Sequence, residues 1–206
     1  MQDNNKNEIL ITDEDALKYE AAMRYMLAKL DLINTGLSDE LGRKAASNIS
    51  GRVKSIESIK NKLRRKNRKI TGKNVHDVIK DIAGVRAVCF FVDDLYKFHE
   101  QLTYHSDITI LKVKDYIKKP KKSGYRSLHL ICRLDMPFAG QMLHTTVEIQ
   151  LRTNAMDYWA ELDNQLRYKK ENESSTQIGK KLKSYADEIS SIDKKMMKLR
   201  NRISQL

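Results

Sequence analysis

The sequence contains little cysteine and no long apolar run. Only Cys89 and Cys132 occur among its 206 residues, which excludes a disulfide scaffold and a four-cysteine zinc site by count. The longest apolar run, Ala87–Val92, is much shorter than the roughly 20 residues that a membrane-spanning helix needs. The N-terminal segment lacks the basic and apolar blocks of a signal peptide. We therefore expect a cytoplasmic protein without a membrane segment, in which both cysteines are buried.

Glycine-rich phosphate loops are absent as well. The sequence contains neither GxxxxGK followed by Ser or Thr nor GxGxxG, so bound phosphates would be held by side chains rather than by a backbone cradle. Hydrophobic residues make up 40% of the chain, which is enough for a core and excludes a disordered or collagen-like protein. At this length we expect one domain with helical extensions.

Positive charge is present in excess. The chain has 39 Lys and Arg residues against 27 Asp and Glu residues, a net charge of +12, which favours polyanionic partners. This positive charge is concentrated in two segments. Residues 52–73 hold ten basic residues and one acidic residue, and residues 112–126 hold seven basic residues and one acidic residue. The rest of the chain is slightly acidic. The sequence thus predicts two separate basic surfaces.

Hydrophobic spacing predicts both helices and strands. Thr12 and Asp15 form a capping pattern before an amphipathic helix that we expect to end near Asn34 and Gly36. Thr153 is expected to cap a helix over residues 154–170. Two other helices are expected over residues 55–69 and 94–105, and strands over residues 85–92, 107–113, 125–134 and 143–151.

Two of the expected strands alternate between apolar and polar residues. In each strand the apolar set occupies one face and leaves chemically active groups on the other. The first strand opposes Leu128, Leu130, Cys132 and Leu134 to Tyr125, Ser127 and His129, and the second opposes Thr145, Val147, Ile149 and Leu151 to Glu148 and Gln150.

The C-terminal segment has the strongest periodicity in the chain. Apolar residues recur at alternating spacings of four and three, as in a coiled-coil seam, and a lone helix cannot bury such a stripe. We favour self-association through this helix, with packing inside one chain as the alternative. The seam consists of Ile178, Leu182, Tyr185, Ile189, Ile192, Met196, Leu199, Ile203 and Leu206.

The first basic segment offers a row of phosphate ligands. Lys54, Ser58, Lys62 and Arg65 follow one another at helical spacing on one face, where their side chains could follow a polyphosphate. The alternative is a solvated basic face, or one that binds RNA backbone without specificity.

The second basic segment ends in a turn that leads into an aromatic strand residue. Lys121 begins the turn, and Tyr125 shares a strand face with His129, so a base could stack on the phenol ring beside cationic groups. The alternative for Tyr125 is a structural role in the core.

Two carboxylates complete the candidate chemistry. Asp81 stands just before the apolar strand, and Glu148 lies in the middle of another strand, on the face opposite Val147 and Ile149. Together they could share a magnesium ion, which prefers oxygen ligands, and one could accept a hydroxyl proton. Ordinary acids at a sheet edge are the alternative.

Several runs of sequence occur together and in order: GRVKSIES, DIAGVR, KDYIKKPKKSGYRSLH, VEIQLRT and AMDYWAELDNQLRYK. This set resembles the synthetase domain of the RelA/SpoT family, in particular its small stand-alone alarmone synthetases. The resemblance implies an α/β (α+β) fold, with a nucleotidyltransferase-like mixed sheet flanked by helices. It also implies a GTP diphosphokinase of the stringent response: the 3′-hydroxyl of GDP or GTP attacks the β-phosphorus of ATP, giving (p)ppGpp and AMP. The alternative is a nonenzymatic RNA-binding module.

The resemblance also implies a role for each candidate residue. Asp81 and Glu148 would bind Mg²⁺, and Glu148 would act as the general base. The ATP site would consist of Arg52 and Arg86, which sandwich the adenine, and of Lys54, Ser58, Lys62 and Arg65 on the phosphates. The GDP or GTP site would consist of Lys121, Tyr125, His129 and Gln150, with Tyr125 stacked on the guanine.

The same resemblance divides the chain into a helical extension over residues 1–49, the synthetase domain over 50–170, and an oligomerising helix over 171–206. It implies a homotetramer, and in some relatives a cleft that binds (p)ppGpp as an activator. Single-stranded RNA is a further partner to consider. Asp157 and Asp163–Asn164 depart from the residues common in relatives, whereas Lys112–Asp115 resemble a motif that bears on the choice between GDP and GTP. No hydrolase domain is expected.

Overall fold

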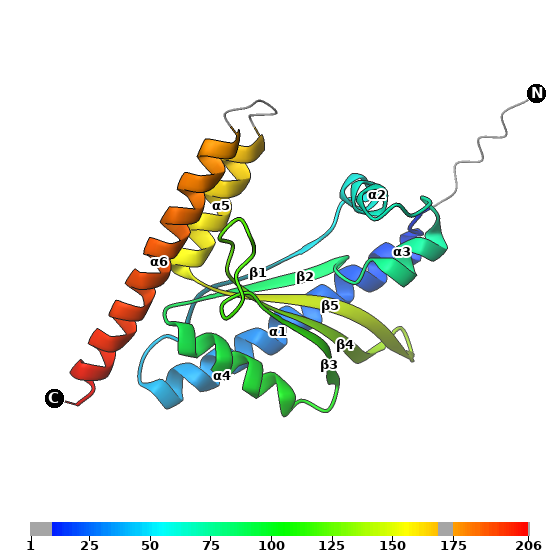
Figure 1. The fold of residues 1–206 in the computed structure, drawn as a ribbon. Coiled ribbons are helices and arrows are strands. Elements are labelled where there is room, and N and C mark those ends of the chain that lie inside the picture. The colour runs from blue at the N-terminus through cyan, green and yellow to red at the C-terminus, as the bar shows by residue number, and fades with distance from the viewer. Residues whose placement is uncertain (1–9, 169–174, 206) are drawn as a thin grey trace, which may run out of the picture.

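The computed structural model describes residues 10–168 and 175–205 as one domain in which six helices surround a five-stranded sheet (Figure 1). The strands are β1 (Ala46–Val53), β2 (Ala83–Cys89), β3 (Ile108–Asp115), β4 (Leu128–Phe138) and β5 (Gln141–Thr153). The helices are α1 (Asp13–Leu41), α2 (Ile56–Arg65), α3 (Gly72–Val78), α4 (Val92–Thr103), α5 (Asn154–Tyr168) and α6 (Ser175–Ile203).

The sheet is mixed, which confirms the expected fold class. Its strand order is β1-β2-β5-β4-β3. Strands β2 and β5 are parallel, and the other neighbouring pairs are antiparallel. Helices α1 and α4 cover one face of the sheet, while α2 and the α5–α6 pair stand at opposite ends of the other face (Figure 1). Two cavities lie on that second face, which is called the open face below.

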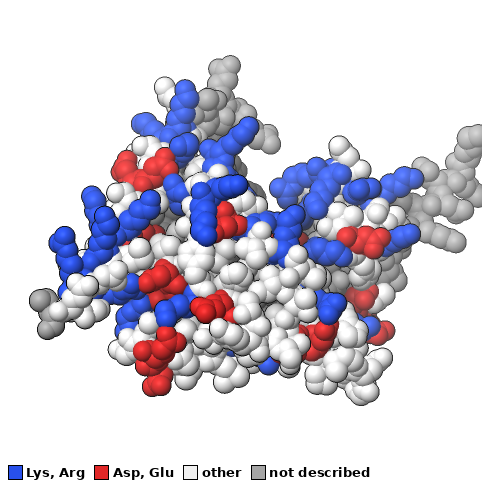
Figure 2. Space-filling view, turned by 60° about the horizontal axis from the view of Figure 1, so that its bottom comes forward, with Lys and Arg blue, Asp and Glu red and all other residues white. Residues whose placement is uncertain are grey.

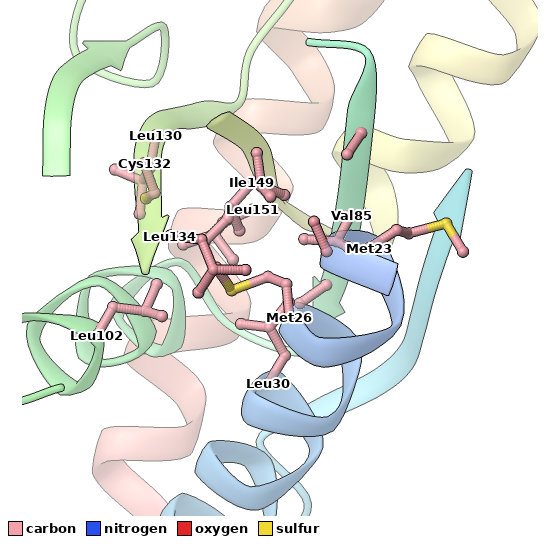
Figure 3. Close-up of a cluster of buried hydrophobic side chains, with 14 of the residues drawn as sticks. Met23, Met26, Leu30, Val85, Leu102, Leu130, Cys132, Leu134, Ile149 and Leu151 are labelled. Atoms are coloured by element: carbon pink, nitrogen blue, oxygen red, sulfur yellow. The ribbon is translucent and has the colours of Figure 1, made fainter. Parts of the chain in front are cut away.

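The hydrophobic core lies between the sheet and the helices α1 and α4. Met26 and Leu30 of α1 point toward the inner side chains of the strands, among them Leu130 and Ile149 (Figure 3). Leu128, Leu130, Cys132 and Leu134 are all buried in this cluster together with Val147, Ile149 and Leu151. The predicted alternation of β4 and β5 is thus confirmed, and both cysteines are buried.

Helix α1 begins as predicted but ends later. Thr12 and Asp15 form the expected capping box. The helix then continues past Gly36 to Leu41, so the predicted end near Asn34 and Gly36 is wrong. Burial of Leu37 against the core stabilises the added turns, and Gly42, with φ of 61°, provides the left-handed cap that ends the helix.

The first basic segment is less helical than predicted. Helix α2 ends at Arg65 rather than at residue 69, because Asn67 adopts a left-handed φ of 51°. Strand β1, which the sequence did not predict, precedes it. Its exposure pattern does not alternate strictly, and Gly51 lies against Met23 of α1, where an added Cβ would come within 2.8 Å of that side chain.

The C-terminal helix buries only part of its apolar seam. Leu182 and Ala186 of α6 pack on Trp159 and Ala160 of α5, with Ile178 and Ile189 beside them. The expected helix end at residue 170 and the last seam residue, Leu206, lie outside the described residues. None of the helices of the described part is long and apolar enough to span a membrane. Packing within one chain leaves Tyr185, Ile192, Met196, Leu199 and Ile203 exposed.

Candidate active site

The open face of the sheet carries the polar residues of four neighbouring strands. Because Val147 and Ile149 point into the core, Glu148 and Gln150 point to the open side. Gly84 of β2 pairs with Glu148 on one side and with Arg52 on the other. The surface of the sheet therefore carries no side chain at Gly84.

Two cavities meet on this face. Both are lined by Asp81 and Glu148, which are the residues they share. The first has a volume of about 360 Å³ and the second of about 370 Å³. The first cavity is lined by Ser50, Gly51, Arg52, Lys54, Gly84, Val85, Arg86, Gln150, Arg152, Glu161 and Asn164, and the second by Lys62, Lys66, Val78, Lys80, Leu111, Lys112, Lys114 and Ile131.

Asp81 lies between two lysines. Its Oδ2 accepts a hydrogen bond from Lys62 Nζ at 2.6 Å and lies 3.2 Å from Lys54 Nζ. Its other oxygen, Oδ1, is buried without a hydrogen-bond partner among the described residues, which is unusual for a carboxylate in a folded protein. One oxygen is thus held by cations and the other is available to a ligand.

Glu148 is buried and hydrogen-bonded on both oxygens. Its Oε1 lies 3.2 Å from His129 Nδ1, and its Oε2 accepts from Gln150 Nε2 at 2.8 Å. Burial alone would raise the pKa of Glu148, but the hydrogen bonds and charge of His129, together with Gln150, lower this pKa to about 2. The carboxylate therefore stays ionised at neutral pH.

A hydrogen-bond network around Arg152 connects β2, β5, α5 and the segment before β4. Arg152 donates to Tyr125 Oη and Gln150 Oε1, each at 2.8 Å, and to Asp157 Oδ1 at 3.0 Å. The same Asp157 oxygen accepts from Arg86 at 2.9 Å. Arg152 is not among the predicted site residues, although it continues the alternation of Glu148 and Gln150 along β5, which could have identified it.

The predicted row along α2 is only partly formed. Lys54 precedes the helix, so its assignment to a helical face is wrong, but its side chain still meets Lys62 at Asp81. The Ser58 hydroxyl accepts from Ser55 at 2.9 Å in the first turn of α2. Arg65 is exposed at the last turn. The structure therefore brings together the two lysines, with Ser58 and Arg65 further along the helix.

Tyr125 lies before β4 rather than within it, because the strand begins at Leu128. Its hydroxyl still reaches His129 Nε2, at 2.8 Å. Lys121 Nζ lies 4.7 Å from the ring centres of both Tyr116 and Tyr125. A base stacked on this face of the ring would take the place of Lys121, whose pKa is lowered by burial and by the charge of Lys114.

Positive charge surrounds this region. Lys and Arg side chains crowd the upper half of the view in Figure 2, whereas its lower half is mostly uncharged with scattered acids. Six lysines line the two cavities, together with three arginines. Such an arrangement attracts anions to the site.

Comparison with known proteins gives consistent matches. The sequence profile described as the region found in RelA/SpoT proteins matches residues 51–173. GTP pyrophosphokinase YwaC of Bacillus subtilis is 38% identical over 198 residues, covering 96% of this chain and 91% of the relative. The crystal structure of small alarmone synthetase 1 of Bacillus subtilis bound to its product pppGpp superposes with a TM-score of 0.81 at 33% identity, covering 91% of this chain and 95% of that one.

Small alarmone synthetase 2 of the same organism also superposes with a TM-score of 0.81, at 38% identity, covering 92% of this chain and 97% of that one. These likenesses extend over nearly the whole chain. The profile match alone spans more than half of the sequence. The chain therefore belongs to the RelA/SpoT family.

Proposed function

We propose that the protein is a GTP pyrophosphokinase that transfers the β,γ-diphosphate of ATP to the 3′-hydroxyl of GDP or GTP. The observation that carries this proposal is the junction of two cation-lined cavities at Asp81 and Glu148. A diphosphate transfer needs a donor and an acceptor nucleotide held side by side with the reacting groups between them. Relatives named GTP pyrophosphokinases and a relative crystallised with pppGpp support this assignment.

The first cavity is the proposed ATP site. Arg52 and Arg86 line it from neighbouring strands, and guanidinium planes stack well on a base. Asp157 holds Arg86 in place. Lys54 from the first cavity and Lys62 from the second both point at the carboxylate of Asp81, where the two cavities meet. At this junction they would contact the ATP phosphates, with Ser58 and Arg65 extending the row along α2.

The acceptor site is proposed on the other side of Glu148. Tyr125 and Lys121 would hold the guanine nucleotide, with the Lys121 ammonium moving from the aromatic rings to a phosphate. His129 and Gln150 both hydrogen-bond to Glu148, so they would orient the carboxylate toward the ribose. Lys112 and Lys114 in the second cavity add positive charge for the acceptor phosphates.

The residues present fit a magnesium ion. Asp81 offers a buried oxygen without a partner, and Glu148 lines the same two cavities. The described residues contain no group of three or more His, Cys, Asp or Glu that could hold a metal, so phosphate oxygens and water would supply the other ligands. When bound, the metal would neutralise charge that develops on the transferred phosphates.

In the proposed reaction, the ribose 3′-oxygen forms a bond to the β-phosphorus of ATP. The bond from that phosphorus to the α,β-bridging oxygen breaks at the same time, and AMP leaves. Glu148, ionised at neutral pH, takes the hydroxyl proton. A carboxylate with a pKa of about 2 is a weak base. The negative charge of bound phosphates would raise that pKa, whereas a bound cation would lower it.

The test is an assay with ATP, Mg²⁺ and GDP that follows AMP and ppGpp. Glu148→Gln should abolish product formation while largely preserving nucleotide binding. Glu188→Gln, on the exposed surface of α6, serves as the matched control and should turn over normally. Unchanged turnover in Glu148→Gln would reject the role of Glu148, and RNA binding without AMP release would favour the nonenzymatic alternative.

We also propose that the protein self-associates through α6, as a tetramer in the cytoplasm. This proposal rests on the exposed seam residues, among them Ile192, Met196 and Leu199, which are 49%, 54% and 52% exposed. Contact with water makes an exposed row of apolar side chains unfavourable unless a second apolar surface covers it. The family's tetramers offer a cleft for (p)ppGpp as an activator in some members, and the same assay with added product would test for it.

A further inference from the structure

The turn that carries the proposed acceptor residues lies directly on α6. Hydrogen bonds from Gly124 N to Lys121 O and from Lys121 N to Tyr125 O close this turn. Gly124 is buried and has a φ of 93°. A Cβ added there would lie 2.7 Å from the Cβ of Ala186 and 3.2 Å from the Cα of Lys183. Only glycine fits here, because the turn backbone touches the helix.

The residues after Gly124 are also attached to the helical pair. Tyr125 packs in the cluster formed by Trp159, Leu182 and Ala186. Trp159 Nε1 donates to the Leu182 carbonyl at 2.8 Å, which joins α5 to α6. Arg126 donates to Asp187 Oδ1 at 2.8 Å. Three consecutive residues thus take their position from α6 or from the cluster that α6 completes.

Hydrogen bonds connect the attached turn to the acceptor side of the proposed active site. Tyr125 Oη contacts His129 Nε2 and Arg152, and His129 in turn contacts Glu148. Arg52 and Lys54, on the proposed donor side, lie at the end of β1 and just after it, and Lys54 is held by Asp81. Arg86 is connected to Tyr125 through Arg152 and Asp157. A shift of α6 would therefore displace Tyr125 directly, and would reach Arg86 only through two further side chains.

We infer that α6 is a positioning element of the acceptor site: Lys183, Ala186 and Asp187 hold the turn that presents Lys121 and Tyr125 to the guanine nucleotide. This inference rests on the proposed function of that turn. The helix surface used for it is distinct from the exposed seam at Tyr185, Ile192 and Met196. One helix thus joins the proposed assembly contact to acceptor binding.

The experiment compares two glycines that both have positive φ. Gly124→Ala forces a Cβ against α6, whereas Gly140→Ala, with a φ of 80° and nothing within 4 Å, imposes similar backbone strain in the β4–β5 hairpin. Because an overpacked contact costs enough to change binding by about tenfold, we expect Gly124→Ala to raise KM for GDP by about that factor. KM for ATP should stay within about twofold, and Gly140→Ala should leave both unchanged.

A second substitution separates the helix contact from backbone strain. Ala186→Gly removes the atom that the new Cβ would meet at 2.7 Å, so the double variant Gly124→Ala, Ala186→Gly should recover most of the GDP affinity. If Gly124→Ala does not fold, Ala186→Val presses on the same turn from the helix side and should produce the same selective rise in KM for GDP. An equal rise for ATP, or no recovery in the double variant, would overturn the inference.

A spectroscopic signal tests the contact without activity. Trp159 is the single tryptophan of the chain and is 4% exposed, so its emission reports on whether α6 covers α5. Gly124→Ala should shift that emission to longer wavelength, and Ala186→Gly should reverse the shift. If the wild-type protein formed no product from ATP and GDP, the proposed function would fail, while this emission shift would still decide whether the turn is seated on α6.

Discussion

Removing the imidazole of His129 should change the ionisation of Glu148. The pKa of Glu148 is lowered from 4.5 to about 2, against the effect of burial, mainly by the hydrogen bond and charge of His129. That difference corresponds to on the order of 3 kcal/mol in favour of the ionised carboxylate. His129→Phe keeps an aromatic ring beside Tyr116 and Tyr125 but removes both nitrogens. We expect the pKa of Glu148 to rise to its ordinary value or higher, because the carboxylate stays buried.

The sign of the stability effect follows from linkage. A carboxylate with a depressed folded-state pKa stabilises the fold above its unfolded pKa, and this contribution is lost as the pH falls from 4.5 toward about 2. The stability difference between the wild type and His129→Phe should therefore shrink as the pH falls from 4.5 toward about 2. Chemical denaturation at several pH values would measure this dependence.

The direct assay is a carboxyl ¹³C titration of Glu148, assigned by comparison with Glu148→Gln. His144→Phe is the control, because His144 is 62% exposed and pairs with Asp135 at 2.7 Å in the β4–β5 hairpin. It should leave the Glu148 titration unchanged. If Glu148 titrated at the same pH in the wild type and in His129→Phe, the imidazole would not be the cause of the low pKa and the reasoning would be refuted.

Two further substitutions test the cavity floor and the exposed seam. Gly84→Val should leave the unfolding temperature equal or higher, because a β-branched residue suits a strand and the nearest protein atom to an added Cβ is 3.8 Å away. The same substitution should raise KM for ATP at least about tenfold, because the new side chain fills the cavity. Normal ATP binding would contradict the placement of the donor. The double variant Ile192→Glu, Met196→Glu should lower the mass per particle measured by light scattering without shifting the Trp159 emission. An unchanged mass would show that the seam does not form the contact between copies of the chain.

Local patterns in the sequence predicted much of the sheet. The alternation in β4 and β5 placed Leu130 and Ile149 in the core and Glu148 on the opposite face, because strand side chains must alternate. The capping box at Thr12 and Asp15 is equally local and was read correctly. Helix ends were harder to predict, since the burial of Leu37 carries α1 past Gly36 and the left-handed cap at Gly42 ends it.

The amino-acid sequence alone specifies which residue types could do the chemistry, and the co-occurrence of its motifs indicates the family. It did not determine which of these residues meet. Lys54 and Lys62 converge on Asp81 only because β1, α2 and the segment before β2 come together in the fold. The Arg152 network joins residues from four parts of the chain, and the seating of Gly124 on α6 joins residues more than 50 positions apart. Contacts of this kind depend on how whole elements pack, and periodicity along one segment carries no information about them.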